Sequence, residues 1–353
     1  MRFTLASEKQ TFNSFALSNL VKYEPYLEEP LGYYETSYIT ENRITRAQFP
    51  GPPPRIGTFS IPDCFVDIKE NLYLSLHESL QINLPTIDWS FELQSKMRPT
   101  YTFPKNCKYI KGTSLLVHGK WISSYYHFVN EAIGKLYVAG LDTDLSGIDN
   151  IFFPTLTLRY CNFFAQQFGL AERCRDIPSE PVVFEKLLLP TYPSRCGWPS
   201  AGTLAYLNEI KIPTDKASSN DKQKALYLTG RTTRKPTNEE EVINLLQKLG
   251  LEVVNPDMLS NAEQIQIFRS ARLVVSPHGG ALTNLAFAKD IAVIELFGSQ
   301  YVNACFAALC KQLGHSYSFI ICEPITGSDR NYIVDTSKLK SLVLSYLWGF
   351  YLQ

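Results

Sequence analysis

The sequence predicts an α/β protein made of two Rossmann-like halves, each with a mainly parallel sheet. The chain has 353 residues, more than a single hydrophobic core usually serves, so two domains are expected. Apolar residues make up 45% of it and charged residues 19%, as in a well-packed globular protein. From residue 114 onward, short apolar strands alternate with short helices, a pattern typical of a parallel sheet covered on both faces.

The first 110 residues lack this alternation. They are rich in Pro, Tyr and Phe, and the stretch "PGPPPR" at 50–55 is a rigid break. Short strand-like pieces occur, such as "LYLSL" at 72–76, but no long helical period. We expect an irregular, β-containing extension of the N-terminal domain.

The N-terminal Rossmann-like domain is predicted to end near residue 212. Its strands and helices alternate in the order strand 114–119, helix 123–140, strand 150–156, helix 158–169, strand 182–190 and helix 200–211. The polar, turn-rich segment 212–224 then predicts a linker.

The C-terminal Rossmann-like domain is predicted over residues 213–336. Strands are expected at 225–230, 251–255, 272–276, 292–297 and 317–322, and helices at 238–249, 261–270, 279–288 and 302–313. The final segment, 337–353, is expected to be helical, and packing of this helix against the N-terminal domain stays open.

Helix 238–249 has the strongest local signals. Thr237 and Glu240 have the spacing of a capping box, and Gly250 is placed to end the helix. An apolar stripe on one face consists of Val242, Leu245, Leu246 and Leu249.

Composition excludes several classes of protein. Lys plus Arg equals Asp plus Glu at 34 each, so the chain has no overall charge that would attract a nucleic acid. Its eight cysteines form no CxxC pair and no metal-type spacing with the five histidines, which indicates reduced, buried thiols. There is no signal-peptide pattern and no apolar run of transmembrane length. A cytoplasmic protein is expected, and peripheral association with the inner face of the membrane stays open.

A glycine-histidine turn follows strand 272–276. In an open parallel sheet, ligands bind at the carboxyl ends of the strands. Gly279 and Gly280 let the backbone approach a ligand, and the next helix starts there with its positive end outward, which predicts an anion site. His278, Thr283 and Asn284 are candidate side-chain donors to a phosphate or sugar. The alternative is an ordinary strand-to-helix turn in which His278 caps the helix or faces solvent.

Two arginines follow strand 225–230 at the same predicted edge of the sheet. Arg231 and Arg234 lie where a diphosphate would arrive, and the planar guanidinium suits phosphate oxygens. The alternative is an exposed basic loop that pairs with the acidic residues 239–241. Glu295, at the end of strand 292–297, is a candidate acceptor of hydrogen bonds from a ribose or sugar hydroxyl, or else an ordinary ion-pair partner.

The helix at 123–140 carries a second candidate pair. His127 and Glu131 are four residues apart, on the side opposite to a core stripe formed by Val129, Ile133, Leu136 and Tyr137. They are either a solvated pair or, across an interdomain cleft from the anion site, the group that takes a proton from an acceptor hydroxyl.

Together these three segments resemble glycosyltransferase family 61, whose members include capsular polysaccharide biosynthesis proteins. The likeness extends from about residue 115 to 325 and rests on Tyr125-Tyr126-His127-Phe128 with Glu131, Arg231 and Arg234 with Asn238-Glu239, and His278 to Asn284 with Phe287 and Glu295. The family's Gly-Ala-Gly order is Gly279-Gly280-Ala281 in this chain, and Ser276-Pro277 stands where small residues are expected.

The resemblance implies a GT-B-like fold, with two Rossmann-like domains facing one another across a cleft. The C-terminal domain would hold a nucleotide-sugar donor, with UDP as the expected nucleotide. It implies inverting transfer with no essential metal and no further cofactor. Arg231, Arg234 and the turn from His278 to Asn284, including Ala281 and Leu282, would stabilise the departing diphosphate. Glu131 is the expected base, with His127 as the second choice.

The acceptor implied by the resemblance is a glycan or a lipid-linked glycan. Two other functions stay open: a glycan-binding protein that has lost the chemistry, and a Rossmann oxidoreductase, which the missing glycine-rich fingerprint disfavours. A DxD sequence, Asp142-Thr143-Asp144, follows a helix rather than a buried strand, so a metal site is not expected there.

Overall fold

The computed structural model describes most of the chain from residue 57 onward. It describes residues 57–70, 72–76, 103–104, 107–119, 121–193, 200–210, 224–230, 233–325 and 330–351, together with the backbone of several short strands before residue 102. The chain divides into two compact units: the first unit is 1–33 with 52–206, and the second unit is 34–51 with 207–353. The predicted linker lies almost wholly outside the described residues.

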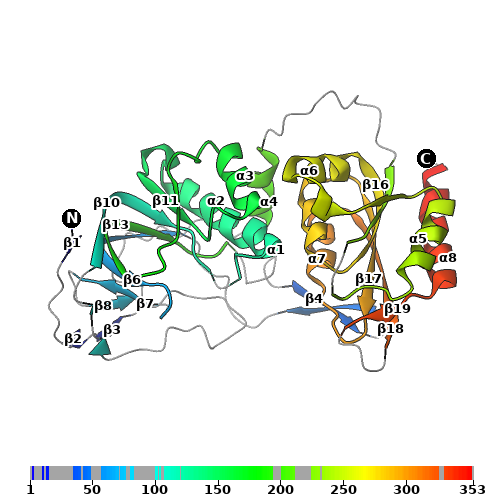
Figure 1. Ribbon diagram of the computed structural model, residues 1–353, viewed down its shortest axis with the longest axis horizontal. Coiled ribbons are helices and arrows are strands. Elements are labelled where there is room, and N and C mark those ends of the chain that lie inside the picture. Colours follow the sequence, from blue (N-terminus) through cyan, green and yellow to red (C-terminus); the bar gives the residue numbers. More distant parts are fainter. Residues whose placement is uncertain are drawn as a thin grey trace. The chain divides into compact units, whose positions relative to one another are not determined.

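The first unit is built on one large mixed sheet (Figure 1). Its parallel part has the order β12 (Cys174–Asp176), β11 (Asn150–Phe153), β10 (Cys107–Leu116) and β13 (Val182–Pro190). The sheet continues through β6 (Thr58–Asp67), β7 (Leu72–Ser75), β8 (Leu80–Ile82) and β3 (Asn13–Phe15), and β1 (Arg2–Phe3) pairs with β10.

The prediction of an irregular extension before residue 110 is therefore only partly right. β6 runs antiparallel to β13 along its whole length, and β7 pairs with β6. Phe59 and Ile61, two residues apart on β6, point to the same face and are buried in the core of this sheet, where Val66 is also buried. The segment that lacks helical period is thus the antiparallel continuation of the parallel sheet.

A continuous helical stretch follows β10. It consists of α1 (Tyr125–His127), a π-helical turn η3 (Phe128–Ala132) and α2 (Ile133–Asp142). α2 packs over β13 and β6, and the unit also contains η4 (Leu145–Gly147), α3 (Arg159–Gln167) and the start of α4 (Ala201–Asn208). The predicted helix at 123–140 is confirmed, with the π turn as an addition.

The second unit has a sheet of six strands in which the first five are parallel. Their order is β15 (Glu252–Val254), β14 (Lys224–Leu228), β16 (Ala271–Pro277), β17 (Ala292–Gly298) and β18 (Ser316–Pro324), and β19 (Tyr332–Ile333) adds an antiparallel edge. From β14 the chain moves outward to β15 and then returns to the other side at β16. The carboxyl ends of β14 and β16 are therefore a topological switch point, where doubly wound sheets bind ligands.

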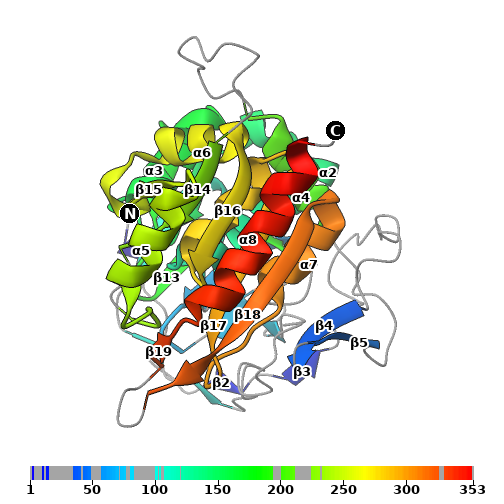
Figure 2. The ribbon, with the colours of Figure 1, turned by 90° about the vertical axis from the view of Figure 1, so that its right-hand side faces the viewer.

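Helices cover both faces of this second sheet. α6 (Asn261–Ser270) and α7 (Cys305–Leu313) lie on one side, and α5 (Glu239–Lys248) and α8 (Thr336–Tyr351) lie on the other (Figures 1 and 2). Two 3-10 turns complete it, η5 (Pro256–Met258) and η6 (Gly280–Phe287). The unit also contains a hairpin of β4 (Glu35–Thr40) and β5 (Arg43–Gln48), and β2 (Gln10–Thr11) pairs with β9 (Thr100–Tyr101) elsewhere in the chain.

The terminal helix α8 has a different place from the one considered above. It runs beside α5 (Figure 2), and its Leu339 and Val343 are fully buried in the core of the second unit. These apolar residues cover the same face of the sheet as Val242 and Leu246 of α5. α8 thus belongs to the second unit rather than to the N-terminal domain.

The predicted capping box of α5 is wrong. The N-cap is Asn238, whose side chain makes no capping bond, and the Thr237 hydroxyl donates instead to the Tyr332 carbonyl at 3.3 Å. A neighbouring strand therefore competes successfully for this hydroxyl. The predicted end of the helix is confirmed, since Gly250 has a φ of 85°. A complete capping box occurs at α6, where Ser260 and Glu263 bond one another's backbone N–H groups.

The protein is thus a mixed α/β protein with two large sheets. The arrangement of its two halves across a cleft stays a prediction. Among the described residues, no helix combines the length and the apolar character that crossing a bilayer requires.

Candidate functional site

The turn after β16 lies at the switch point of the second sheet. The His278 N–H donates to the Leu296 carbonyl at 2.9 Å, which ties the turn to β17. Gly279 is extended, with φ of 177°, and η6 begins at Gly280. A Cβ added to Gly280 would meet no atom within 4 Å. The first backbone N–H groups of η6 are therefore next to open space, as an anion site requires.

The helix predicted at 279–288 is a 3-10 helix instead. Its buried residues are Leu282 to Phe287, whereas Gly280 and Ala281 are only half-buried. A 3-10 helix is tighter than an α-helix, and its N-terminus still presents unpaired donors. The change of helix type leaves the predicted position of the amides intact.

His278 is held by a buried hydrogen-bonded chain. Its Nδ1 lies 2.5 Å from Glu295 Oε1, and the Tyr317 hydroxyl donates to Glu295 Oε2 at 2.5 Å. Burial, reinforced by the Glu295 carboxylate, raises the pKa of Tyr317 well above its usual value, so the phenol keeps the proton that it donates. The carboxylate fixes the orientation of the imidazole and leaves Nε2 as its second polar atom.

Glu295 was considered above as a partner for a ribose hydroxyl. It is 0% exposed, and each of its carboxylate oxygens has a partner inside the protein. This geometry favours a role in positioning His278. An aromatic box closes around the imidazole, with Phe297, Tyr301 and Phe306 at 5.2, 5.4 and 5.4 Å between ring centroids.

Thr283 and Asn284 lie inside the second unit, each 0% exposed. The Asn284 amide donates to Gln264 Oε1 at 3.1 Å and to the Ala281 carbonyl at 3.0 Å, which braces the first turn of η6 against α6. Within the described residues the Thr283 hydroxyl has no hydrogen-bond partner. Their burial favours support of the turn over direct contact with a ligand.

Arg234 lies on the loop between β14 and α5, and Arg231 lies outside the described residues. Arg234 has a left-handed backbone, with φ of 57°, and its guanidinium lies 4.9 Å from the centroid of the Tyr301 ring. The next residues are tied to the β19 segment: the Lys235 N–H donates to Asn331 Oδ1 at 3.2 Å, and the Thr237 N–H to the Tyr332 carbonyl at 2.9 Å. Tyr301 also contacts His278, so the structure brings the arginine loop and the glycine-histidine turn together.

The acidic residues after this loop have other partners. Glu239 accepts hydrogen bonds from Thr229 and Tyr227, at 2.7 and 3.2 Å. Glu241 accepts them from Asn238 and Thr336, at 3.1 and 3.0 Å. In the part of the chain that the structure describes, no ion pair joins Arg234 to these acids, so the alternative of a self-paired basic loop has no support there.

Three residues of this site were not predicted from the sequence. Tyr317 is on β18, Tyr301 follows β17, and Arg330 lies just before β19. Tyr301 could have been suspected because it follows a strand at the carboxyl edge. Nothing in the sequence around Tyr317 or Arg330 indicates a site.

The first unit places His127 and Glu131 at the start of the helix that follows β10. His127 Nδ1 lies 2.5 Å from Glu131 Oε1. Their side chains differ sharply in exposure, 24% for His127 and 1% for Glu131, so this is not a solvated pair. Glu131 lies on η3, a π turn, which holds more residues per turn than an α-helix. Both Glu131 and Val129 on this turn are buried.

Lys135 continues this line of side chains one turn further. It is 1% exposed, donates from Nζ to the His118 carbonyl, and lies over the Tyr192 ring at 4.0 Å. Burial lowers the pKa of Lys135 to about 7, against an opposing effect of Glu131. His118 Nδ1 hydrogen-bonds with the Tyr73 hydroxyl at 2.8 Å, and burial, with Lys135, lowers the pKa of His118 to about 4. The sequence indicated no role for either residue.

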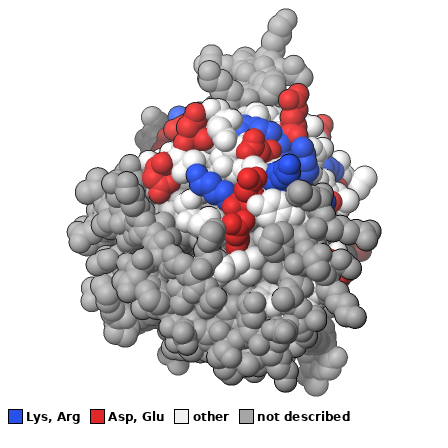
Figure 3. Space-filling model, turned by 90° about the vertical axis from the view of Figure 1, so that its left-hand side faces the viewer, with Lys and Arg blue, Asp and Glu red and all other residues white. Residues whose placement is uncertain are grey.

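The DxD aspartates have structural partners. Asp142 accepts a hydrogen bond from the Thr58 N–H at 3.2 Å, and Asp144 caps η4 by accepting from the Ser146 N–H at 2.9 Å. The described part of the face in Figure 3 shows Lys and Arg interspersed with Asp and Glu, as the balanced charge led us to expect.

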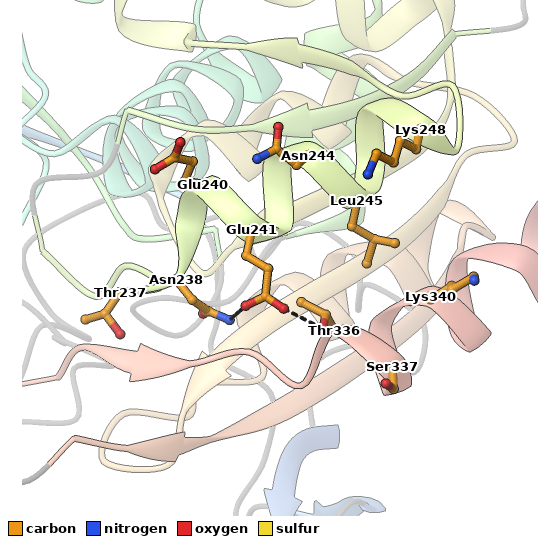
Figure 4. A pocket seen from close by; sticks show the side chains of 10 residues that line it. All are labelled: Thr237, Asn238, Glu240, Glu241, Asn244, Leu245, Lys248, Thr336, Ser337 and Lys340. Atoms are coloured by element: carbon orange, nitrogen blue, oxygen red, sulfur yellow. Dashed lines mark hydrogen bonds between the residues drawn. The ribbon is translucent and has the colours of Figure 1, made fainter.

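An open groove of about 640 Å³ lies between α5 and α8 (Figure 4). It is lined by Thr237, Asn238, Glu240, Glu241, Asn244, Leu245, Lys248, Thr336, Ser337 and Lys340. Glu241 of α5 accepts hydrogen bonds from Asn238 at the start of its own helix and from Thr336 at the start of α8. None of the predicted site residues lines this groove, which we interpret as a surface depression between two packed helices.

One family of known proteins matches a segment of this chain. The family model described as Glycosyltransferase 61 matches residues 125–294, from the first residue of α1 into β17. The match includes His127, Glu131, Arg234 and the turn from His278 to Asn284. No curated protein matches the chain. By this match, the segment 125–294 belongs to glycosyltransferase family 61, and the protein that carries it is a transferase enzyme.

Proposed function

We propose that this enzyme moves a sugar, with inversion at the anomeric carbon, from a nucleotide-sugar donor to a hydroxyl of a glycan or lipid-linked glycan acceptor. The expected nucleotide is UDP. The observation that carries the proposal is the meeting of Arg234, Tyr301 and His278 beside the open start of η6, at the switch point of the second sheet.

The diphosphate would bind to the second unit. The backbone N–H groups at Gly280 and Ala281 and the guanidinium of Arg234 suit phosphate oxygens, with Arg231 as a further expected donor. These groups stabilise the charge that collects on the diphosphate as it leaves, and because they are fixed beforehand, little reorganisation is needed during the reaction. No step of this mechanism requires a divalent metal ion. With Nδ1 held by Glu295, His278 presents Nε2 as its remaining donor when the imidazole is charged.

The first unit would supply the base. We assign the base to His127, because its side chain is the exposed member of the pair, and we assign Glu131 to orienting it and stabilising its positive charge. The acceptor oxygen attacks the anomeric carbon, its proton passes to His127, and the bond from that carbon to the diphosphate oxygen breaks. The nucleoside diphosphate leaves with the bonding electrons.

A cytoplasmic location, with peripheral association at the inner face of the membrane, fits a lipid-linked acceptor and a soluble nucleotide sugar.

A donor panel tests the proposal. Purified protein is incubated with UDP-, GDP-, CDP- and dTDP-sugars and a mixture of glycan acceptors, and release of nucleoside diphosphate is measured with and without EDTA. We expect release from one class of donor, equally in both conditions. Binding of glycans without release from any donor would favour a glycan-binding protein, and stabilisation by NAD alone would favour an oxidoreductase.

A further inference from the structure

Three groups that can carry positive charge lie around the ring of Tyr301. It closes a turn after β17, in which its N–H donates to the Gly298 carbonyl at 3.0 Å, and its side chain is 36% exposed. The guanidinium carbons of Arg234 and Arg330 lie 4.9 and 5.8 Å from the ring centroid, and the His278 ring lies 5.4 Å away. Two arginines nearly one hundred residues apart in the sequence therefore meet on one aromatic ring.

Both arginines have an uncommon backbone. Arg234 and Arg330 have φ of 57° and 75°, and only four described residues other than glycine have a positive φ. Such a conformation is energetically unfavourable and persists where neighbouring contacts enforce it, often at ligand-binding sites. Here the Arg330 N–H donates to Gln300 Oε1 at 3.1 Å, and the residue after Arg234 is bonded to Asn331. Both loops are thus held in place by contacts with one another and with the turn of Tyr301.

The shared ring limits the distance between the guanidinium groups. Each guanidinium carbon lies within 5.8 Å of the same centroid, so both arginines are near enough to contact one ligand of the size of a nucleoside diphosphate. An aromatic ring holds a guanidinium through its flat face and leaves the N–H groups at its edge able to donate. Two such cations beside the start of η6 suit a ligand with two adjacent anionic groups.

We propose that Arg330 is a second phosphate-binding residue of the donor site, and that Tyr301 is a positioning residue that holds Arg234 and Arg330 for the two phosphates of a nucleoside diphosphate. This inference rests on the proposed function. It adds a contact to the terminal phosphate from a residue beyond the segment that the family match covers.

The test compares the affinities of UDP and UMP for the full-length protein by calorimetry, with GDP and CDP in parallel. In Arg330→Gln we expect UDP to bind about tenfold more weakly or worse, because a charge-assisted hydrogen bond is lost, and UMP to bind nearly as it does to the wild type. Lys289→Gln removes an exposed positive charge just before β17, at the opposite edge of the same sheet, and should leave both affinities unchanged.

Two variants of Tyr301 separate positioning from folding. Tyr301→Phe keeps the ring and should retain the affinity for UDP, whereas Tyr301→Leu removes the ring and should lose as much affinity as Arg330→Gln. Melting temperatures close to that of the wild type confirm that each variant is folded.

The outcomes distinguish this inference from the proposed function. If Arg330→Gln or Tyr301→Leu bound UDP like the wild type while Arg234→Ala bound it weakly, the inference would be overturned and the proposed function would stand. If Arg330→Gln weakened the binding of UDP and UMP equally, the proposed contact between Arg330 and the terminal phosphate would also be overturned. If the wild type bound no nucleoside diphosphate, both proposals would fail together.

Discussion

His127 and Glu131 illustrate how one buried carboxylate can change a prediction. From spacing alone both side chains were candidates for the base, with Glu131 preferred. The structure leaves that choice untested, but the exposures of 24% and 1% favour His127 as the group that an acceptor hydroxyl can reach. A carboxylate behind an imidazole keeps its tautomer fixed and stabilises the charged form, as in other hydrogen-bonded catalytic pairs.

Substitution of each member of the pair tests these roles. We expect His127→Asn to lower kcat by about 100-fold or more, since a general base typically contributes that much. Glu131→Gln should lower kcat less, because the imidazole stays in place while it loses its carboxylate partner. Affinity for UDP should stay unchanged in both. Normal turnover by His127→Asn, together with an inactive Glu131→Gln, would restore Glu131 as the base.

Lys135 predicts an unusual dependence of stability on pH. Its pKa is lowered from 10.5 to about 7 by burial in the folded protein. Between these two pKa values the unfolded chain holds a proton that the folded protein has released, so the free energy of unfolding rises with pH.

The comparison with Lys135→Met isolates this effect. Urea denaturation at several pH values between about 7 and 10 should show the wild type gaining stability relative to the variant as pH rises. A difference between the two proteins that is constant over this range would mean that the lysine is charged in the folded state.

At the level of single residues, the sequence indicated only those side chains that stand in a recognisable pattern. Arg234, His278 and Gly280 follow predicted strands, and the structure brings these three positions to one edge of the second sheet. Tyr317 and Arg330 could not be found, because their roles arise from strand order and from loops that meet in space. Glu295 was found, but the burial that favours a supporting role is a property of the folded sheet.

At the scale of elements, the contribution of Gly280 at the start of η6 to ligand binding can be separated from its contribution to stability. Gly280 has open space where a Cβ would lie and no left-handed φ, so the folded protein has no need of glycine there. A ligand that approaches the backbone closely would require glycine there, because a side chain would occupy the same space.

Gly280→Ala separates stability from binding. We expect an unchanged or slightly higher free energy of unfolding, by at most about 1 kcal/mol, because alanine restricts the unfolded chain. Affinity for the nucleoside diphosphate should fall by about 1–3 kcal/mol, since a methyl group would crowd the phosphate. Gly147→Ala, also in open space but on η4 of the first unit, is the matched control for both measurements. Undiminished binding by Gly280→Ala would show that the ligand does not approach this turn.

Most strands and helices after residue 114 were predictable, because alternation of short apolar runs with amphipathic segments is a local property. Three features were not. The first is β6 and β7, whose place depends on pairing with β13, more than one hundred residues later. The second is the cap of α5, where Tyr332 competes for the Thr237 hydroxyl. The third is the π turn at 128–132, a segment in which no residue forbids an α-helix.

At the scale of the whole molecule, two sheets each have a His–Glu pair near their carboxyl ends. His127 and Glu131 belong to the helix that follows β10, and His278 and Glu295 join the end of β16 to β17. In both pairs the carboxylate is the more deeply buried partner, at 1% or less. Since parallel sheets bind ligands at this edge, we propose that the first pair serves the acceptor chemistry and the second pair serves donor binding.

The claim on which the mechanism depends is that backbone N–H groups and arginines of the second unit hold the donor diphosphate without a divalent ion. The most direct measurement is a crystal structure of the protein soaked with UDP in the presence of EDTA. We predict that the phosphates lie against the N–H groups of Gly280 and Ala281, within hydrogen-bonding distance of Arg234. Phosphates bound at another place, or bound only after a divalent metal ion is added, would contradict the claim.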